Sequence, residues 1–205
     1  MIAASLVKEL REKTGAGMMD CKNALEETGG DIEKAIDQLR KTGAVKAAKK
    51  ASRAANDGVV LSYIHPGSRL GVMVEVNCET DFVARTDNFQ QFVRDVAMHI
   101  AAANPVVVKR DQMPAGLADR EKAIFMEQAR ESGKPEAIIE KMVTGRLEKF
   151  YAENTLLEQP FVKDPQKTIG DYLKATIATL GENILISRFV RFELGEASQN
   201  GNAAD

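Results

Sequence analysis

A change of periodicity near the middle of the chain constrains the fold more than any other feature. Val72, Val74 and Val76 alternate with other side chains, which is the period-two pattern of a half-buried strand. Further along, apolar side chains recur at the spacing of an amphipathic helix: Phe89, Phe92, Val93, Val96, Ala97 and Ile100. Phe82 therefore lies in a short strand-to-helix connection, and such connections are well placed to contact another molecule.

Two other segments are predicted to pair with this strand. Alternating apolar side chains over 59–64, followed by a Pro-Gly-Ser turn at 66–68, predict a β-hairpin with the strand at 70–77. A final strand over 183–194 is predicted to turn one set of side chains to one face and a second set to the other. The first set is Ile184, Ile186, Val190 and Phe192, and the second is Leu185, Ser187 and Phe189.

These strands, with the helices between them, predict an α+β fold. We expect a three-stranded antiparallel sheet that is covered on one face by helices. The helices are predicted at roughly 87–103, 117–132, 136–152 and 168–180. Thr168 and Asp171 form the capping-box signature of the last one.

The N-terminal part, residues 1–54, is predicted to be a separate three-helix module with a linker. Glycines separate its helices, and Asp31 is the expected N-cap of the third. The stretch 40–53 is rich in Ala and Lys, which predicts an extended helix or a semi-rigid linker. Residues 55–196 would then form the core domain, and the small, polar residues 197–205 are expected to be disordered.

The composition favours an ordinary globular protein and excludes some classes of partner. Of the 205 residues, 44% are hydrophobic and 28% are charged, and the formal net charge is −2. This charge argues against bulk electrostatic capture of nucleic acid. No apolar run approaches the roughly 20 residues that a membrane helix needs, and the N-terminus lacks a secretory signal. We therefore expect a cytoplasmic location and no direct contact with nucleic acid or membrane.

No motif indicates catalysis or a cofactor. The sequence has no GxxxxGK[ST] phosphate loop, and its two cysteines and two histidines lack the spacing of a zinc site. Glu79 and Asp81 are a conceivable acid–base pair, but they are expected to point in different directions on one short connection. We expect no catalytic residue, no metal site and no cofactor.

Three blocks of sequence resemble the elongation factor Ts family, whose members exchange nucleotide on elongation factor Tu. They are LVKELR at 6–11 with TGAGMMDCK at 14–22, EVNCETDFVAR at 75–85, and LEQPFV at 157–162 with GENI at 181–184 and RFE at 191–193. A lone Thr-Asp-Phe would be weak support, but the three blocks in this order are specific and span almost the whole chain.

The resemblance implies a function and a set of contact residues. The chain would bind elongation factor Tu·GDP and promote GDP release, with a ubiquitin-associated-like bundle at its N-terminus. Family members insert the aspartate and phenylalanine that match Asp81 and Phe82 into the nucleotide-binding domain of the partner. We assign a nucleotide-release wedge to Thr80, Asp81, Phe82 and Val83.

The resemblance also assigns a docking role to Met18 and Met19, because the matching pair in the family helps to dock the N-terminal module on the partner. Two adjacent residues cannot share a narrow buried stripe, so we expect one of them to pack inside and at least one to contact the partner.

The length of the chain bears on its assembly. Longer family members carry a duplicated core subdomain and a coiled-coil insertion, for which 205 residues leave no room. We therefore expect a short form that doubles its core by homodimerisation.

Other interpretations remain open at this stage. From the residues alone, Phe82 is also interpretable as a core residue that holds the connection against the sheet. The N-terminal bundle is interpretable as a binding module for ribosome-associated or ubiquitin-like partners, with the rest as scaffold. A hydrolase that uses Asp81 and Glu79 is a third hypothesis.

Overall fold

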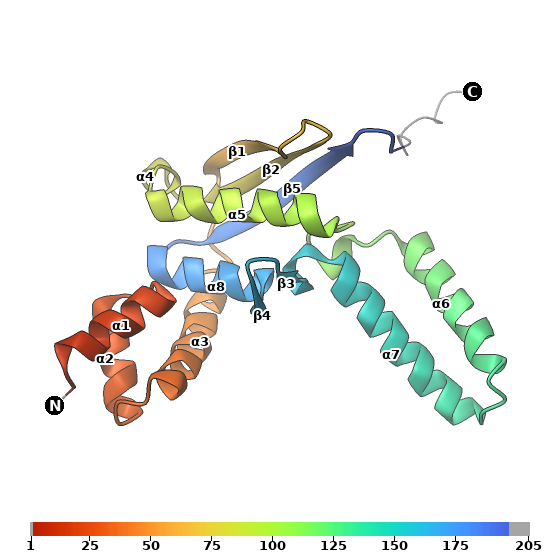
Figure 1. Ribbon diagram of the computed structural model, residues 1–205, viewed down its shortest axis with the longest axis horizontal. Coiled ribbons are helices and arrows are strands. Elements are labelled where there is room, and N and C mark those ends of the chain that lie inside the picture. Colours follow the sequence, from red (N-terminus) through yellow and green to blue (C-terminus); the bar gives the residue numbers. More distant parts are fainter. Residues whose placement is uncertain (1, 197–205) are drawn as a thin grey trace.

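The computed structural model, which describes residues 2–196, has the α+β architecture expected from the sequence (Figure 1). Three helices, α1 to α3, precede an antiparallel hairpin of β1 and β2. Seven further helical segments and three strands follow. The elements are α1 Ala4–Thr14, α2 Met18–Glu27, α3 Ile32–Ala48, β1 Asp57–Ile64, β2 Leu70–Cys78, α4 Asp81–Ala84, α5 Asp87–Ala103, η1 Arg110–Gln112, α6 Ala115–Arg130, α7 Glu136–Asn154, η2 Leu156–Glu158, β3 Pro160–Phe161, β4 Asp164–Thr168, α8 Ile169–Leu180 and β5 Ile184–Glu193.

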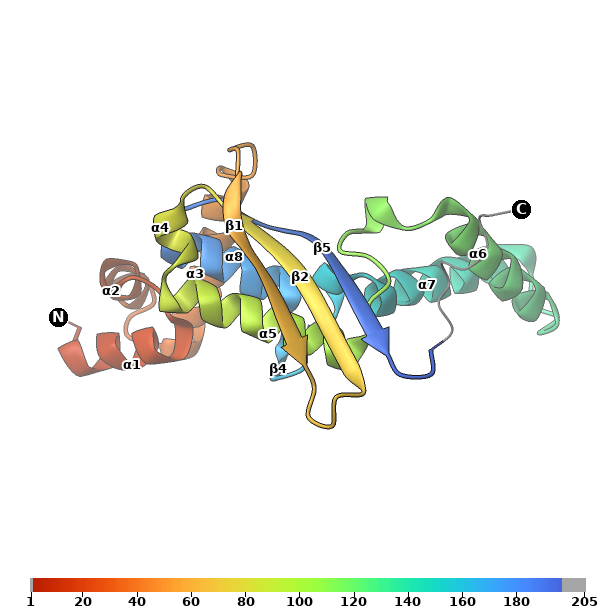
Figure 2. The same cartoon turned by 90° about the horizontal axis from the view of Figure 1, so that it is seen from above.

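The main sheet has the strand order β1-β2-β5, with both pairs antiparallel, as predicted. Its inner face carries the alternating valines of β2, which are buried against α5 and α8. Viewed from above, the three strands lie over these helices, and no other helix or strand of residues 2–196 covers the outer face of the sheet (Figure 2). The hydrophobic core that supports the strand-to-helix connection therefore lies on one face of the sheet.

The second half of β5 differs from the prediction because the strand contains a β-bulge. Val76 pairs with Ile186 and Glu75 pairs with Arg188, so Ser187 is an extra residue without a partner. A one-residue insertion moves each later side chain of the strand to the opposite face of the sheet from the one that strict alternation predicts. Phe189 consequently packs on the core, whereas Val190 is 41% exposed and Phe192 is 70% exposed on the outer face. The expectation that Val190 and Phe192 share a face with Ile184 and Ile186 was wrong.

The N-terminal helices bury a small cluster of their own, centred on Leu10, Cys21 and Leu25. The Asp31 side chain accepts a hydrogen bond from the backbone N–H of Lys34 at 3.1 Å, which confirms it as the N-cap of α3. Most of the predicted linker is helical, because α3 continues to Ala48. The end of α3 packs on α8, where the missing side chain of Gly43 allows a close approach to Ala178.

Helices α6 and α7 depart from the expected cover of the sheet. They pair with each other as an antiparallel hairpin that projects away from the core (Figure 1). Their shared cluster consists of Ala129, Ile139 and Val143, with Phe125 and Met126 packed against it. The conclusion that the chain has no room for a coiled-coil-like insertion was therefore wrong. Apolar periodicity does not distinguish a helix that packs on a sheet from one that packs on a neighbouring helix.

Within residues 2–196, none of the helices combines the length and apolar character required to cross a membrane. The prediction of a disordered tail over 197–205 lies outside the described residues.

Candidate partner-binding site

The predicted wedge forms a single short helix directly after β2. The strand ends at Cys78, and Thr80 caps the four-residue helix α4 by accepting a hydrogen bond from the Val83 backbone N–H at 3.4 Å. Thr86 then caps α5, whose Phe89 and Phe92 are fully buried. Two capped helix starts therefore follow one another, and both depend on threonine hydroxyls that the local sequence supplies.

The four wedge residues have different surroundings. Phe82 is 79% exposed, the largest exposed fraction among the big apolar side chains in the described part of the chain. The Asp81 carboxylate forms an ion pair with Arg85 at 2.8 Å, one helical turn further on. Thr80 is exposed, whereas Val83 is half-buried and packs against the main core. The interpretation of Phe82 as a core residue was wrong.

The side chains before the wedge are bound within the protein. Glu79 accepts a hydrogen bond from the Asn183 backbone N–H at 2.6 Å and lies 3.5 Å from the Arg53 guanidinium. Burial raises the pKa of the Cys78 thiol to about 11, so the thiol is protonated at neutral pH. Glu79 and Asp81 thus have separate partners and do not face a common target. Their geometry does not favour the hydrolase hypothesis.

Met18 and Met19 are both exposed, at 57% and 64%. The buried face of α2 begins only at Cys21, one turn into the helix, so neither methionine reaches the small core of the module. The expectation that one of them packs inside was wrong. Exposed methionines of this kind are common at adaptable binding surfaces.

The wedge and the methionine pair lie toward the same end of the molecule. In both views, α4 and the α1–α2 pair lie at the end opposite the α6–α7 hairpin (Figures 1 and 2). The structure also brings the turn Gly181-Glu182-Asn183 against the start of the wedge. This turn belongs to one of the family-like sequence blocks, but the sequence alone indicated no role for it. The contact joins residues that are 102 apart in the chain, a pairing that no local pattern indicates.

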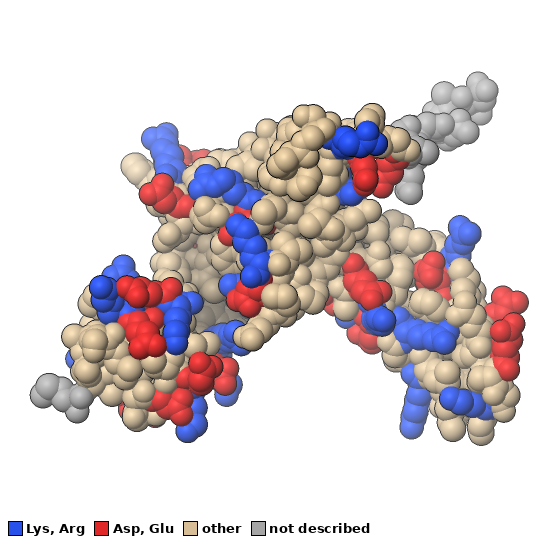
Figure 3. Space-filling model, in the orientation of Figure 1, with Lys and Arg blue, Asp and Glu red and all other residues tan. Residues whose placement is uncertain are grey.

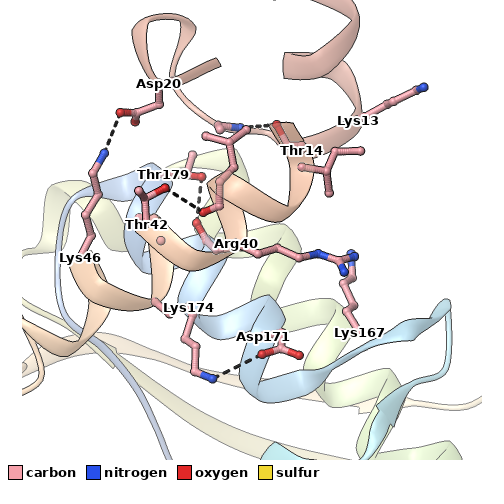
Figure 4. A pocket seen from close by; sticks show the side chains of 18 of the residues that line it. Lys13, Thr14, Asp20, Arg40, Thr42, Lys46, Lys167, Asp171, Lys174 and Thr179 are labelled. Atoms are coloured by element: carbon pink, nitrogen blue, oxygen red, sulfur yellow. Dashed lines mark hydrogen bonds and ion pairs between the residues drawn. The ribbon is translucent and has the colours of Figure 1, made fainter. Parts of the chain in front are cut away.

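A separate cavity of about 250 Å³ lies between the N-terminal module and α8 (Figure 4). Three of its carboxylates pair with lysines: Asp20 with Lys46 at 2.7 Å, Asp164 with Lys167 at 3.2 Å and Asp171 with Lys174 at 3.3 Å. Its threonine hydroxyls donate to backbone carbonyls, as Thr42 does to that of Gln38 at 2.8 Å. These polar groups are engaged in structural interactions, so the cavity does not present an activated nucleophile.

The surface charge is mixed. Basic and acidic side chains are interspersed over the N-terminal bundle and the hairpin on the face shown in Figure 3. Within residues 2–196, no group of three or more His, Cys, Asp or Glu side chains is arranged to hold a metal ion. The distinctive feature of the site is thus an exposed aromatic ring on a rigid scaffold.

Comparison with known proteins gives one consistent result. The family model described as elongation factor TS matches residues 2–196. A protein of Citrifermentans bemidjiense named elongation factor Ts is 62% identical over 195 residues, which cover 95% of this chain and 90% of the relative. One from Thermoanaerobacter sp. strain X514 with the same name is 57% identical over 202 residues, covering 98% and 99% of the two chains. The chain belongs to the elongation factor Ts family.

Proposed function

We propose that this protein is a guanine nucleotide exchange factor that binds elongation factor Tu·GDP and promotes GDP release during translation elongation in the cytoplasm. It would do so by binding alone, without a covalent step and without a cofactor. The observation that carries the proposal is the 79% exposure of Phe82 on a capped helix fixed to the core. A large apolar ring held in solvent costs free energy unless a partner covers it, and buried aromatic side chains dominate protein interfaces.

The proposed mechanism is a thermodynamic competition. A GTPase holds GDP through its phosphate loop, a magnesium ion and contacts to the base. If the Phe82 wedge binds best when these elements are displaced, its binding lowers the affinity for GDP. By linkage, GDP weakens the binding of the wedge by the same factor. The exchange factor therefore speeds release without changing the equilibrium between free GDP and free GTP.

Stopped-flow fluorescence tests this function directly. Elongation factor Tu is loaded with a fluorescent GDP analogue and mixed with excess unlabelled GDP, with and without the purified protein. We expect release to accelerate in proportion to the concentration of the protein until binding saturates. An unchanged release rate would contradict the proposed function.

The alternative of a binding module makes a different prediction. If residues 1–54 only recognised ribosome-associated or ubiquitin-like proteins, that segment would capture the same partners as the full chain. Exchange on elongation factor Tu needs the core as well, because the wedge lies outside the module. Comparing the proteins captured by the full chain and by residues 55–205 separates the two hypotheses.

We also propose that the protein acts as a homodimer, assembled through the outer face of its sheet. Three exposed side chains on adjacent strands gather there: Ile64, Met73 and Phe192, at 61%, 49% and 70% exposure. Gly71 pairs with both Ile64 and Phe192, and the Ile64 side chain lies over this glycine, so the two apolar side chains flank it on the same face. Sheets pack well face to face, and a twofold axis buries one such apolar patch against its copy.

Light scattering after size-exclusion chromatography tests the dimer. The wild-type protein should have twice the mass of the chain, and Phe192→Glu should have the mass of a monomer, because the substitution places a carboxylate at the proposed interface. Ile138→Glu is the matched control, since Ile138 is an exposed apolar residue on the distant α7 helix, at 46% exposure. A monomeric wild type, or loss of the dimer only in the control, would contradict this interface.

A further inference from the structure

The turn between α8 and β5 binds the chain where the wedge begins, through one carboxylate. Glu182 Oε2 accepts hydrogen bonds from the backbone N–H groups of Glu79 and Thr80, each at 3.0 Å. Glu182 Oε1 accepts the hydroxyl hydrogen of Thr80 at 2.6 Å. Both carboxylate oxygens are therefore directed at the two residues that precede α4.

The turn donates hydrogen bonds as well as accepting them. Glu79 accepts a hydrogen bond from the Asn183 backbone N–H at 2.6 Å, and the Asn183 side chain donates to the Arg53 carbonyl at 2.7 Å. Asn183 is only 1% exposed, so this turn is firmly seated in the core. The same turn thus joins the wedge to the chain segment that follows α3.

The wedge needs an external support of this kind. A helix of four residues is far shorter than one that is stable by itself. Phe82 is mostly in solvent, so packing within its own subunit contributes little to holding the ring in place. The direction of the ring therefore depends on the backbone of α4, which is held against the core through Val83 and Ala84 at one end and by Glu79 and Thr80 at the other. Hydrogen bonds to a carboxylate are among the stronger ones available to fix that backbone.

We propose that Glu182 is the positioning residue of the wedge: its carboxylate holds the Thr80 cap so that Phe82 is already oriented before the partner binds. Preorganisation of this kind increases affinity because less conformational freedom is lost on binding. The inference rests on the proposed exchange function for its kinetic consequence. Its structural part, the restriction of Phe82 motion, does not require a partner.

A double-mutant cycle with elongation factor Tu and a fluorescent GDP analogue tests the kinetic consequence. Glu182→Ala should reduce the acceleration of GDP release about tenfold. In a Phe82→Ala background the same substitution should have no further effect, because Glu182 acts through the ring that is absent there. Glu182→Gln, which retains a carbonyl acceptor for the two backbone N–H groups, should restore most of the activity.

The matched control is Glu158→Ala. Glu158 also accepts two hydrogen bonds, both from Arg110, but it lies near the base of the α6–α7 hairpin. Its removal should leave exchange within about twofold of wild type. The proposal is overturned if Glu182→Ala exchanges at the wild-type rate, or if it lowers the rate by the same factor with and without Phe82.

A measurement on the free protein keeps the test independent of the exchange function and of any loss of activity through misfolding. The chain contains no tryptophan, so Phe82→Trp introduces a single fluorescent reporter at the wedge. Time-resolved anisotropy should show little nanosecond motion of this reporter in the otherwise wild-type chain and a clear increase when Glu182→Ala is added. Equal motion in both, with unchanged far-UV circular dichroism, would refute the positioning role.

Discussion

The wedge and the α6–α7 hairpin both project from the core, but they are anchored in different ways. The wedge is a single turn of helix, tied to the α8–β5 turn by the charged Glu182 side chain near the surface. The hairpin consists of two long helices that bury their own cluster. Its base is held by a buried neutral pair, in which His99 Nε2 and Gln159 Oε1 are 3.0 Å apart. A short projection therefore depends on its anchor, whereas a long one is largely stabilised by itself.

Truncating one phenylalanine in each region should give the largest contrast. Phe82→Ala should reduce the acceleration of GDP release roughly 100-fold, since removing an aromatic hot spot costs about 2–4 kcal/mol. Thermal stability should change little, because the ring is mostly exposed. Phe125→Ala in the hairpin cluster should show the reverse pattern, with lower stability and normal exchange. Stopped-flow kinetics and thermal unfolding measure both quantities, and equal exchange rates in the two variants would contradict the assignment of the wedge.

The independence of the hairpin is tested by Ile139→Ala. Ile139 is 3% exposed in a three-residue buried cluster, so its truncation should cost the hairpin about 2 kcal/mol. Hydrogen exchange of the α6 and α7 amides should then accelerate roughly 30-fold, while the amides of β2 and α5 keep their protection. Acceleration spread evenly over the whole chain would show that the hairpin and the core unfold together.

The methionine pair is expected to have a smaller effect than the wedge. Replacing Met18 and Met19 by alanine removes two exposed apolar contacts, at 57% and 64% exposure, and should weaken binding to nucleotide-free elongation factor Tu about tenfold. Ile138→Ala, an exposed apolar truncation on the hairpin, is the control and should leave the affinity unchanged. Calorimetric titration of the partner decides between these outcomes. A loss of affinity in the control alone would place the contact on the α6–α7 hairpin and contradict the assignment of the methionine pair.

Acid should affect the anchor of the hairpin. Burial lowers the pKa of His99 below its usual value of 6.5, so the folded state holds the imidazole neutral. As the pH drops, the unfolded chain binds a proton at this histidine more readily than the folded chain does. The contribution of His99 to the free energy of unfolding is therefore fully present above about pH 6.5 and is lost as the pH falls below that value. The loss is at most about 1.4 kcal/mol at pH 5.5. Urea denaturation at pH 7.5 and 5.5 measures it, and His99→Gln should lack this share of the difference.

Much of the local structure was predictable because its causes are local. The alternation of valines and the spacing of Phe89, Phe92 and Val96 fixed β2 and α5, and the caps at Asp31 and Thr168 follow from short motifs. The exposure of Phe82 was not predictable from the residues alone, since a lone aromatic after a strand is also typical of a core position. Its assignment to the wedge came from the family resemblance.

The remaining differences have non-local causes. The bulge in β5 depends on which residues of β2 pair with it, and the sequence of neither strand alone determines this register. The placement of α6 and α7 depends on what each apolar stripe meets, and the stripe looks the same for a sheet or a helix. The three hydrogen bonds that Glu182 accepts from Glu79 and Thr80 link distant parts of the chain, so the residue proposed to position Phe82 was visible only in three dimensions.

The single unpaired residue in β5 has an evolutionary consequence. Deleting Ser187 would leave Ile186 opposite Val76 and Arg188 opposite Glu75, so Phe189 would stay inward and Phe192 would stay outward. The proposed contact between two copies would then keep its aromatic centre, because the deletion removes only the residue that has no partner in the strand pairing. The state of assembly of such a protein would thus survive the gain or loss of one codon at this position, because the bulge absorbs the extra residue.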